Sequence, residues 1–474
     1  MIIAPHQKLP DVPFTIVGSG PASLTLALKL EEYGIPCLML EAGGFDYTPE
    51  SQDVYRAEVV GDALYDLAWN RLRYFGGTSG RWTGWCRPLD AEDLRTWPIA
   101  HADLAVHLDE ACRILEIKGG FTRDRRVLEN FDQVEFQFSL PPVRFGQKYR
   151  QRIVESRLIS VALNTPVLEI VGSSDGVARE VIVSREGSRA SVPVKSLIVG
   201  AGGIENSRLL LWSQQRASTG FLKNLSIGTH WMEHPHFTTG EFVGDGESLS
   251  RVLGLDEGLG WASSFFFATT PAFRQRQRVA GASVRLKVYE EPVEGFKRRV
   301  EQLMCLAPGL GRKIAGWADK NILCGAEVRM AWEQLPHAEN RIVLDPANHD
   351  AHGVPRLKLH WRLHDEVRTT ALQTMLQLGR DLVAANAGRI GVLPYLTDKL
   401  PFPPGDERGG RHHLGGTRMG TGPGDGVVDR DLRVFGTRNL YVAGSSVFRT
   451  GGYANPTLSI VQLSLRLADY LRKL

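Results

Sequence analysis

The stretch FTIVGSGPASLTLALKLEEYGIPCLMLEAGG, from Phe14 to Gly44, decides the fold. Phe14 to Val17 form a short apolar run typical of a buried parallel strand, and apolar residues then recur at helical spacing from Leu24 to Leu30. A second apolar run, Pro36 to Leu40, follows. The stretch therefore predicts a strand, a glycine turn, a helix and a second strand, which is the beginning of a Rossmann-like α/β domain.

The glycine turn and the carboxylate after the second strand predict a dinucleotide site. Gly18 allows a tight turn, Gly20 lets the backbone approach a pyrophosphate at the helix amino terminus, and Ser23 replaces the usual third glycine. Glu41 lies about 20 residues further on, where a carboxylate accepts hydrogen bonds from ribose hydroxyls. A glycine turn alone is compatible with a structural connection, but the full register favours a cofactor, and the Ala42-Gly43-Gly44 sequel is more typical of FAD than of NAD. The predicted cofactor residues here are Gly18, Ser19, Gly20, Pro21, Ser23, Glu41 and Ala42.

A second glycine-rich segment, RYFGGTSGRWTGWCRPLD, runs from Arg73 to Asp90. By composition it fits a flexible loop equally well. Trp82 and Trp85 favour a packed loop, because exposed indole rings are costly, and the ring of a flavin offers a large flat partner. The small residues around Gly77 would then let backbone amides reach the flavin or its phosphates.

The bulk composition fits a globular enzyme rather than a nucleic-acid-binding protein. The chain has 474 residues, 43% of them hydrophobic, so it is long enough to bury a large cofactor. Its formal charge is +3, and the basic clusters Arg274 to Arg278 and Lys297 to Arg299 are short. We interpret both clusters as solvated faces and expect no nucleic-acid partner.

The cysteines and the apolar runs give the expected compartment. Five cysteines (Cys37, Cys86, Cys112, Cys305 and Cys324) include no C-x-x-C pair, which suggests a reducing environment without a disulfide framework or a thiol redox centre. No metal site is predicted. No secretory leader pattern opens the chain, and no apolar run approaches the roughly 20 residues that cross a bilayer. The expected location is the cytoplasm.

The carboxy-terminal motifs carry a family resemblance. They are RHHLGGTRMG, from Arg411 to Gly420, and GYANPTLS, from Gly452 to Ser459. Together with the first glycine turn, the GGTSGRW loop and GAGGIENSRLLL (Gly200 to Leu211), they closely resemble the glucose-methanol-choline (GMC) oxidoreductases. The similarity is greatest to the branch with pyranose oxidases and the flavin subunits of sugar and gluconate dehydrogenases.

The resemblance implies a fold and a domain division. The expected class is α/β, or α+β taken whole, with a Rossmann-like FAD domain and a substrate domain on an antiparallel or mixed sheet. The FAD domain would combine residues 1–120, 150–235 and 405–474, and the substrate domain residues 121–149 and 236–404. In this scheme Ile227 to His236 leaves the FAD domain, and Glu333 to Leu357 re-enters the substrate sheet. The further cofactor residues that it implies are Arg73, Gly77, Thr78, Ser79, Trp82, Thr83, Val167, Ala201, Gly444, Ser445, Asn455, Pro456 and Thr457.

The resemblance also implies a catalytic pair, His413 and Asn455. His413 has the family spacing to Gly416-Thr417, which the adjacent His412 lacks. Oxidation of an alcohol to a carbonyl requires loss of the hydroxyl proton, and an imidazole accepts a proton near neutral pH. Asn455 cannot accept a proton there, so its implied role is to hold the hydroxyl oxygen.

Two positions depart from the relatives. Arg81 stands where pyranose oxidases carry the histidine that is covalently linked to the flavin, so FAD should be non-covalent. Arg449 stands where relatives commonly have proline. Its charge either favours an anionic substrate or pairs with a carboxylate, and we favour the pairing.

The predicted function is oxidation of a hydroxyl of a sugar, aminosugar or glycoside by an FAD-dependent oxidoreductase. Polar residues of the middle region that fit such a substrate are Arg285, Lys287, Glu327, Arg329, Glu333 and His337, although each also fits the solvent side of the sheet. The alternatives are oxidation of a non-sugar alcohol, a silent flavin-binding scaffold, and a flavoprotein subunit that passes electrons to a partner. The electron acceptor, whether oxygen, a quinone or a haem partner, stays open.

Overall fold

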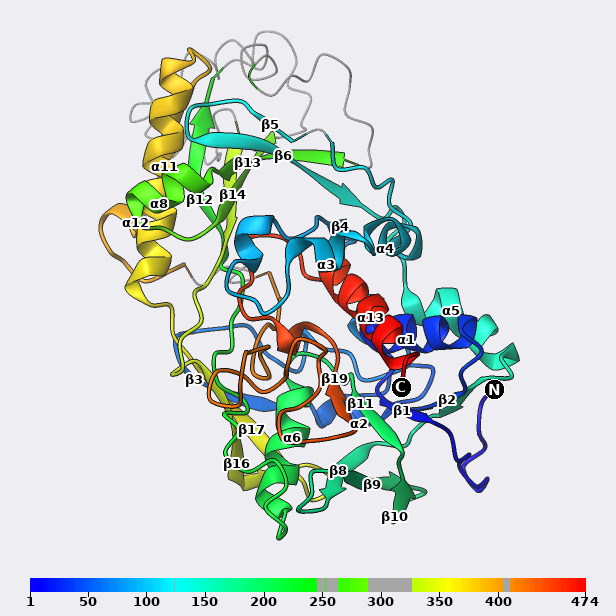
Figure 1. Cartoon of the computed structure of the whole chain (residues 1–474). Coiled ribbons are helices and arrows are strands. Elements are labelled where there is room, and N and C mark those ends of the chain that lie inside the picture. The colour runs from blue at the N-terminus through cyan, green and yellow to red at the C-terminus, as the bar shows by residue number, and fades with distance from the viewer. Residues whose placement is uncertain (123, 245–251, 253–262, 289–325, 404–409) are drawn as a thin grey trace.

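The computed structural model describes residues 1–122, 124–244, 252, 263–288, 326–403 and 410–474. Lys297 to Arg299, Cys305 and Cys324 lie outside these residues. Two sheets dominate the chain, one in the upper half and one in the lower half of the molecule as drawn in Figure 1. The mixed α/β architecture confirms the predicted fold class.

The first sheet has five parallel strands in the order β19-β11-β1-β2-β7. Its strands are β1 (Phe14–Val17), β2 (Cys37–Leu40), β7 (Ile159–Ala162), β11 (Ser196–Val199) and β19 (Leu440–Val442). Nearly every residue of these strands is buried, as expected of a parallel sheet that is covered on both faces. The sequence prediction of β1 as Phe14 to Val17 is confirmed, and β2 begins one residue later than expected.

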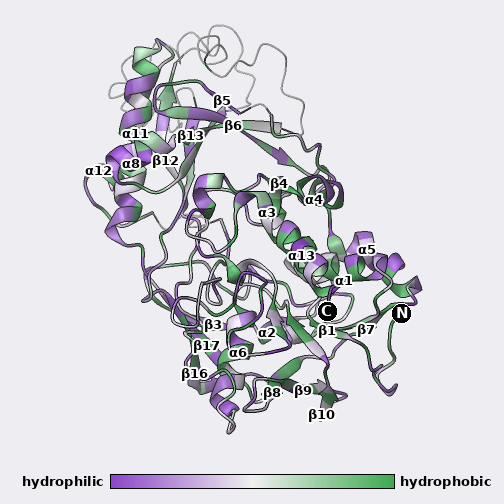
Figure 2. Ribbon diagram, in the orientation of Figure 1, coloured by the Kyte–Doolittle hydropathy of each residue, from purple (hydrophilic) through white to green (hydrophobic). Residues whose placement is uncertain are grey.

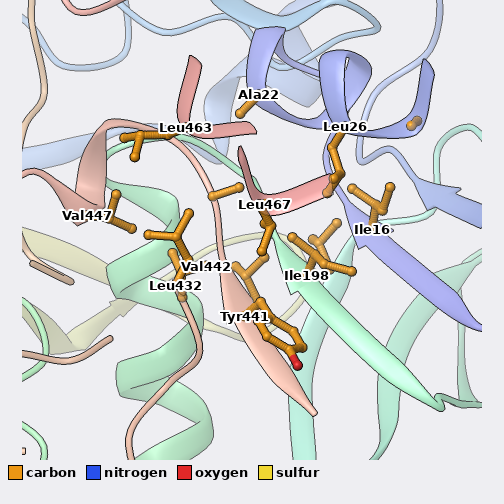
Figure 3. Packing of buried hydrophobic residues seen from close by; sticks show 14 of the residues in the cluster. Ile16, Ala22, Leu26, Ile198, Leu432, Tyr441, Val442, Val447, Leu463 and Leu467 are labelled. Atoms are coloured by element: carbon orange, nitrogen blue, oxygen red, sulfur yellow. The ribbon is translucent and has the colours of Figure 1, made fainter. Parts of the chain in front are cut away.

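Helices α1 (Pro21–Glu32) and α13 (Thr457–Leu471) lie side by side against this sheet, blue and red in Figure 1. Figure 3 shows Leu26 of α1 and Leu467 of α13 packing with Ile16 and Ile198 of the strands. These four side chains are fully buried. The packing joins the two ends of the chain in one core and so fixes the carboxy-terminal motif beside the first glycine turn.

The second sheet has eight antiparallel strands, seven of them in the order β18-β12-β15-β14-β13-β6-β4, with β5 paired to β6. Its strands are β4 (Trp85–Cys86), β5 (Arg125–Arg126), β6 (Phe131–Phe138), β12 (His236–Val243), β13 (Ser263–Thr269), β14 (Ala282–Val288), β15 (Ala326–Trp332) and β18 (Arg389–Val392). β15 alternates buried and half-buried residues along its length, as a strand with one covered face does.

Helix α11 (Asp365–Ala384) packs along this sheet through one apolar stripe. Val367, Ala371, Met375, Leu378 and Leu382 recur at intervals of three and four residues and are fully buried. Figure 2 shows hydrophilic and hydrophobic residues alternating on α11, which fits a helix with one covered face. The apolar stripe of α11 and the covered face of the second sheet form a hydrophobic core that is separate from the core under α13.

The described residues also form two smaller sheets. One is antiparallel and contains β8 (Val167–Gly172), β9 (Ala178–Arg185) and β10 (Ser188–Pro193). The other joins β16 (Arg341–His349) and β17 (Pro355–Trp361) to β3 (Ala57–Gly61). The remaining helices are α2 (Pro49–Asp53), α3 (His101–Ala105), α4 (Leu108–Leu115), α5 (Phe145–Glu155), α6 (Glu205–Arg216), α8 (Pro271–Gln277) and α12 (Pro394–Thr397), with short 3₁₀ turns η1 (Gly77–Gly80), η2 (Ala91–Leu94) and η3 (Ser445–Val447).

The interpretation of Arg274 as part of a solvated face is wrong. Its side chain is only 10% exposed, and its guanidinium lies 3.5 Å from the Asp93 carboxylate. Arg276 and Arg278 are exposed, as expected. A helical run of cations predicts a solvent-exposed face. In the structure, the first cation of this run points inward and neutralises a buried carboxylate.

Cys37, Cys86 and Cys112 are buried free thiols. Among the described helices, none combines the length and the apolar character that crossing a bilayer requires.

Candidate functional site

A cavity of about 690 Å³ opens at the carboxyl ends of the parallel strands. Val17 and Leu40, the last residues of β1 and β2, line it, together with Gly200 after β11 and Gly444 after β19. Ligands of open α/β sheets bind at this edge, because the loops after the strands diverge there. The cavity continues from this edge to the second sheet, whose strands β14 and β15 supply part of its wall.

The glycine turn after β1 fits a pyrophosphate. Gly18 has a φ of +89°, and a Cβ there would lie 2.7 Å from the Gly200 carbonyl oxygen, so only glycine fits. A Cβ at Gly20, in contrast, would meet no atom within 4 Å. No side chain therefore covers the backbone where α1 begins at Pro21. The free amides at the amino terminus of a helix bind anions.

Glu41 lies in the same wall of the cavity. Its carboxylate accepts hydrogen bonds from the Ser19 hydroxyl at 2.6 Å and from the Gly43 amide at 2.8 Å. Burial raises the pKa of Glu41, and these hydrogen bonds oppose that rise. Its position at the end of β2 suits the ribose of a bound FAD.

The loop from Arg73 to Asp90 is packed rather than free. Arg144 Nη1 donates to the Ser79 carbonyl at 2.9 Å, and Trp82 Nε1 donates to the Val143 carbonyl at 2.7 Å. Gly77 comes so close to the glycine turn that its Cβ would lie 3.2 Å from Gly20 Cα. Trp82 and Trp85 both line the cavity. The loop thus supplies small residues and indole rings to the wall of the cavity, in agreement with the packed interpretation.

The cavity brings together nearly all of the residues predicted from the sequence to hold FAD. Those that line it are Gly18, Ser19, Gly20, Pro21, Glu41, Ala42, Arg73, Gly77, Thr78, Ser79, Trp82, Thr83, Val167, Ala201, Gly444, Ser445, Asn455, Pro456 and Thr457. Ser23 does not line it, because its buried hydroxyl turns away and donates to the Gly200 carbonyl at 3.1 Å. Ser23 therefore acts in the close packing of α1 on β11.

His412, rather than His413, contacts Asn455. The Asn455 amide nitrogen Nδ2 lies 3.2 Å from His412 Nε2, and His412 Nδ1 lies 2.8 Å from His234 Nδ1. The His413 ring instead packs beside the rings of Tyr65 and Trp231, with centroids 6.0 Å away in both cases. Both histidines line the cavity, but their side chains leave the backbone toward different surroundings. Among the described residues no hydrogen bond joins His413 to Asn455, and the assignment of these two residues as the catalytic pair stays a prediction.

One placement of protons satisfies the histidine contacts. If Asn455 donates to His412 Nε2, then His412 Nδ1 carries the hydrogen and donates to His234 Nδ1. His234 Nε2 then donates to the Gly451 carbonyl at 3.2 Å. In this series of hydrogen bonds both imidazole rings are neutral, and the lone pair of His412 is on Nε2, beside Asn455.

Burial favours the neutral rings. It is the largest cause that lowers the pKa of His412 well below the usual histidine value, with His234 adding to it. Burial also lowers the pKa of His234 to about 4 and that of His413 to about 3. A desolvated imidazole resists protonation because the charged form loses its hydration. His413 Nε2 is buried and has no hydrogen-bond partner among the described residues.

Glu233 holds the backbone of this histidine pair. Its Oε1 accepts from the amides of His234 and His412, both at 2.8 Å, and Tyr65 donates its hydroxyl to Oε2. Burial raises the pKa of Glu233 to about 8. Glu233 and His234 were not predicted as site residues from the sequence, although both lie in the segment Ile227 to His236, which was predicted to leave the FAD domain.

The second sheet contributes a polar wall. Arg285 of β14 and Arg329 of β15 stand opposite each other in the ladder, and both line the cavity with Ser283. Of the six polar residues suggested for substrate binding, only these two arginines line it. Lys287 is exposed, Glu327 pairs with Arg329 at 3.1 Å, Glu333 accepts from the Gly452 amide at 3.2 Å, and His337 contacts Glu366.

The structure shows the contacts of Arg449 and Arg81, the two residues that depart from the family pattern. Arg449 forms a bidentate ion pair with Asp425, with N–O distances of 2.8 and 2.9 Å, so the carboxylate pairing that we favoured is present. Arg81 lines the cavity, and its Nη1 lies 3.3 Å from the Trp69 carbonyl oxygen. A guanidinium stands at the place of the flavin-linking histidine.

A C-terminal family model of the GMC oxidoreductases matches residues 336–464. Among characterised relatives, 2-methyl-1,2-propanediol dehydrogenase of Mycolicibacterium austroafricanum is 24% identical over 97% of this chain and 94% of its own. The fructose dehydrogenase large subunit of Gluconobacter japonicus is 28% identical over 59% of this chain and 47% of its own length. C-glycoside 3-oxidase of Arthrobacter globiformis is 33% identical, over 27% of this chain and 23% of that enzyme.

Solved structures share the fold. Pyridoxine 4-oxidase from Mesorbium loti superposes with a TM-score of 0.61 and 15% identity over 97% of this chain and 99% of its own. A variant of formate oxidase from Aspergillus oryzae gives a TM-score of 0.59 and 14% identity, over 98% and 99% of the two chains. The family model, the cavity that fits FAD and these similarities lead to one conclusion: residues 336–464 match the C-terminal domain of the GMC oxidoreductases, and the chain is an FAD-dependent enzyme that is similar to members of that family.

Proposed function

We propose that this enzyme oxidises a hydroxyl of a sugar, aminosugar or glycoside to a carbonyl. The observation that carries the proposal is the 3.2 Å contact of His412 Nε2 with Asn455 Nδ2 in the wall of the cavity. FAD supplies the acceptor for the hydride that leaves the hydroxyl-bearing carbon. The residues that would hold it are those of the glycine turn, Glu41, and the loop around Gly77. The division into FAD and substrate domains predicted from the sequence is part of this proposal.

Asn455 and His412 have complementary roles in the proposal. The Asn455 amide donates to the substrate hydroxyl oxygen and fixes its direction. The lone pair of His412 Nε2 faces the Asn455 amide in the proton arrangement above; a bound substrate hydroxyl would replace that contact and give its proton to Nε2. His234 and Glu233 hold the ring and the backbone of His412 and thereby position the base.

His413 is the second candidate for the base. The motif spacing favours it, and its buried Nε2 without a partner among the described residues is free to accept a proton. Its ring, however, is enclosed by Tyr65 and Trp231, and no contact joins it to Asn455 among the described residues. We therefore propose His412 as the base that accepts the proton of the substrate hydroxyl.

The sugar assignment rests on the polar wall and on the relatives. Arg285, Arg329 and Ser283 offer several hydrogen-bonding groups opposite one another on β14 and β15. A wall that offers several hydrogen-bonding groups favours a substrate with several hydroxyls over an apolar alcohol. Two relatives are named for fructose and for C-glycosides, which fits a carbohydrate, and a third is named for a small diol.

An electron-passing subunit without its own alcohol substrate is the alternative from another class. A polar wall and a histidine–asparagine pair have no use in such a subunit. The electron acceptor of the enzyme is left open by these features.

The cofactor gives the first prediction. Because Arg81 cannot form the covalent bond that a histidine forms with the flavin, acid precipitation should release FAD into the supernatant. Absorbance of the supernatant and of the washed pellet measures the two fractions. Yellow colour that stays in the pellet would show a covalent link through another residue.

The substrate class gives the second prediction. Anaerobic mixing with monosaccharides, aminosugars and glycosides should bleach the oxidised flavin with at least one of them, whereas sterols and aryl alcohols should bleach it far more slowly. Stopped-flow absorbance follows the reaction. Fast reduction by aryl alcohols or sterols, with none by any carbohydrate, would contradict the sugar assignment but leave alcohol oxidation standing.

The base gives the third prediction. His412→Ala should keep FAD and slow anaerobic flavin reduction by roughly 100-fold or more, the usual contribution of a positioned general base. Asn455→Ala should also slow reduction, and His413→Ala should slow it much less. His349→Ala, which changes an exposed histidine on β16, is the control. A large loss in His413→Ala with near-parent rates in His412→Ala would instead assign the base to His413.

A further inference from the structure

Three metal-binding side chains gather on the surface away from the FAD cavity. They are His337, Glu339 and His364, and one ligand atom of each lies within 4.8 Å of the other two. As far as the described residues define the cavity, none of the three lines it. They come from two segments: the loop before β16 and the residue that precedes α11.

His364 has a nitrogen without a partner. It is the N-cap residue of α11, but its side chain makes no capping hydrogen bond. Its Nε2 is buried, and among the residues that the structure describes no group hydrogen-bonds to it. Buried polar atoms are almost always satisfied, so an unsatisfied imidazole nitrogen on a residue of this cluster points to a partner that binds there.

His337 is arranged as metal-binding histidines are. Its ring stacks on His364, with centroids 3.8 Å apart and planes at 25°. Its Nε2 lies 2.5 Å from Glu366 Oε1, so this carboxylate orients the ring and leaves Nδ1 with the lone pair. A carboxylate that accepts from the second nitrogen is the usual support of a metal-bound imidazole.

Glu339 supplies the negative charge. Its carboxylate is exposed, and its pKa lies below the ordinary value, chiefly through its own backbone amide and further through the nearby His364 and His337. An exposed side chain can rotate without disturbing the core. Ligand atoms around a tetrahedral zinc with bonds of about 2.1 Å lie about 3.4 Å apart, so the rings of His337 and His364 would have to turn out of their stacked orientation to bind one ion.

We infer that His337, His364 and Glu339 form a Zn²⁺ site. Two imidazoles and one carboxylate suit zinc better than magnesium or calcium, which prefer oxygen ligands alone. Water fills the remaining position. The sequence predicted no metal site, and these three residues become neighbours only in the fold.

The bound ion would pin the loop before β16 to the start of α11. The same loop supports the active-site wall: Asn340 accepts from the Trp231 amide at 2.8 Å, and Gln334 Oε1 accepts from the Glu233 amide at 2.9 Å. Zinc would therefore stabilise the segment that carries Glu233 and His234. This role is independent of the substrate proposed above.

The test is isothermal titration of Zn²⁺ into the FAD-loaded protein, with the affinity tag removed and metals stripped by a chelator. We expect one site per chain and a higher midpoint of thermal unfolding in the presence of Zn²⁺. His337→Ala and His364→Ala should each weaken binding by about tenfold or more, and His349→Ala should not. Unchanged flavin absorbance in each variant verifies that it is folded.

Substitution with Co²⁺ gives a readout of the ligands themselves. Tetrahedral cobalt with two imidazole ligands absorbs visible light, and loss of that absorbance in His364→Ala would place the ion at His364. Absence of Zn²⁺ binding to the parent protein would overturn the inference, as would binding that is equally tight in both histidine variants.

Discussion

At Gly18 the backbone leaves β1 so close to the Gly200 carbonyl that a side chain would not fit. The amide of Gly18 donates to the Leu40 carbonyl at 2.8 Å, and the amide of Gly200 donates to the Val17 carbonyl at 2.9 Å. This contact brings the ends of β1, β2 and β11 to one point and leaves the amino terminus of α1 bare above them. The cofactor cavity exists because three strands end there together, and the helix that closes the chain, α13, packs on the same core.

The end of the cavity that we propose to be catalytic depends on a second constraint, the desolvation of histidine. His234 and His412 share a hydrogen bond away from water, and Glu233 fixes both of their amides. In such surroundings a charged imidazole is disfavoured, so the pair stays neutral and offers a lone pair rather than a proton. The same burial raises the pKa of Glu233 to about 8. A hydroxyl that meets this wall thus finds an acceptor and, in Asn455, a donor.

Local patterns predicted the FAD half of the molecule well. Phe14 to Val17, the glycine turn and Glu41 are contiguous in sequence, and the turn requires glycine for steric reasons that a sequence records directly. The motif spacing favoured His413 over His412, but the sequence does not show which of the two side chains turns toward Asn455 and His234, and in the structure that side chain is His412. The same holds for Ser23, whose hydroxyl turns to Gly200, and for Arg274, whose partner Asp93 is far away in the chain. The polar wall of β14 and β15 needed the strand register, which pairs Arg285 with Arg329.

The central claim is that a buried, neutral histidine accepts the substrate proton, and the pH dependence of anaerobic flavin reduction tests it most directly. A base works only when it is unprotonated, that is, at pH values above its pKa. Because burial lowers the pKa of His412, the rate should stay level as the pH falls through about 6.5, the ordinary histidine value, and should decline only in more acidic solution. A rate that falls with a midpoint near or above 6.5, in protein that still holds its FAD, would contradict the account.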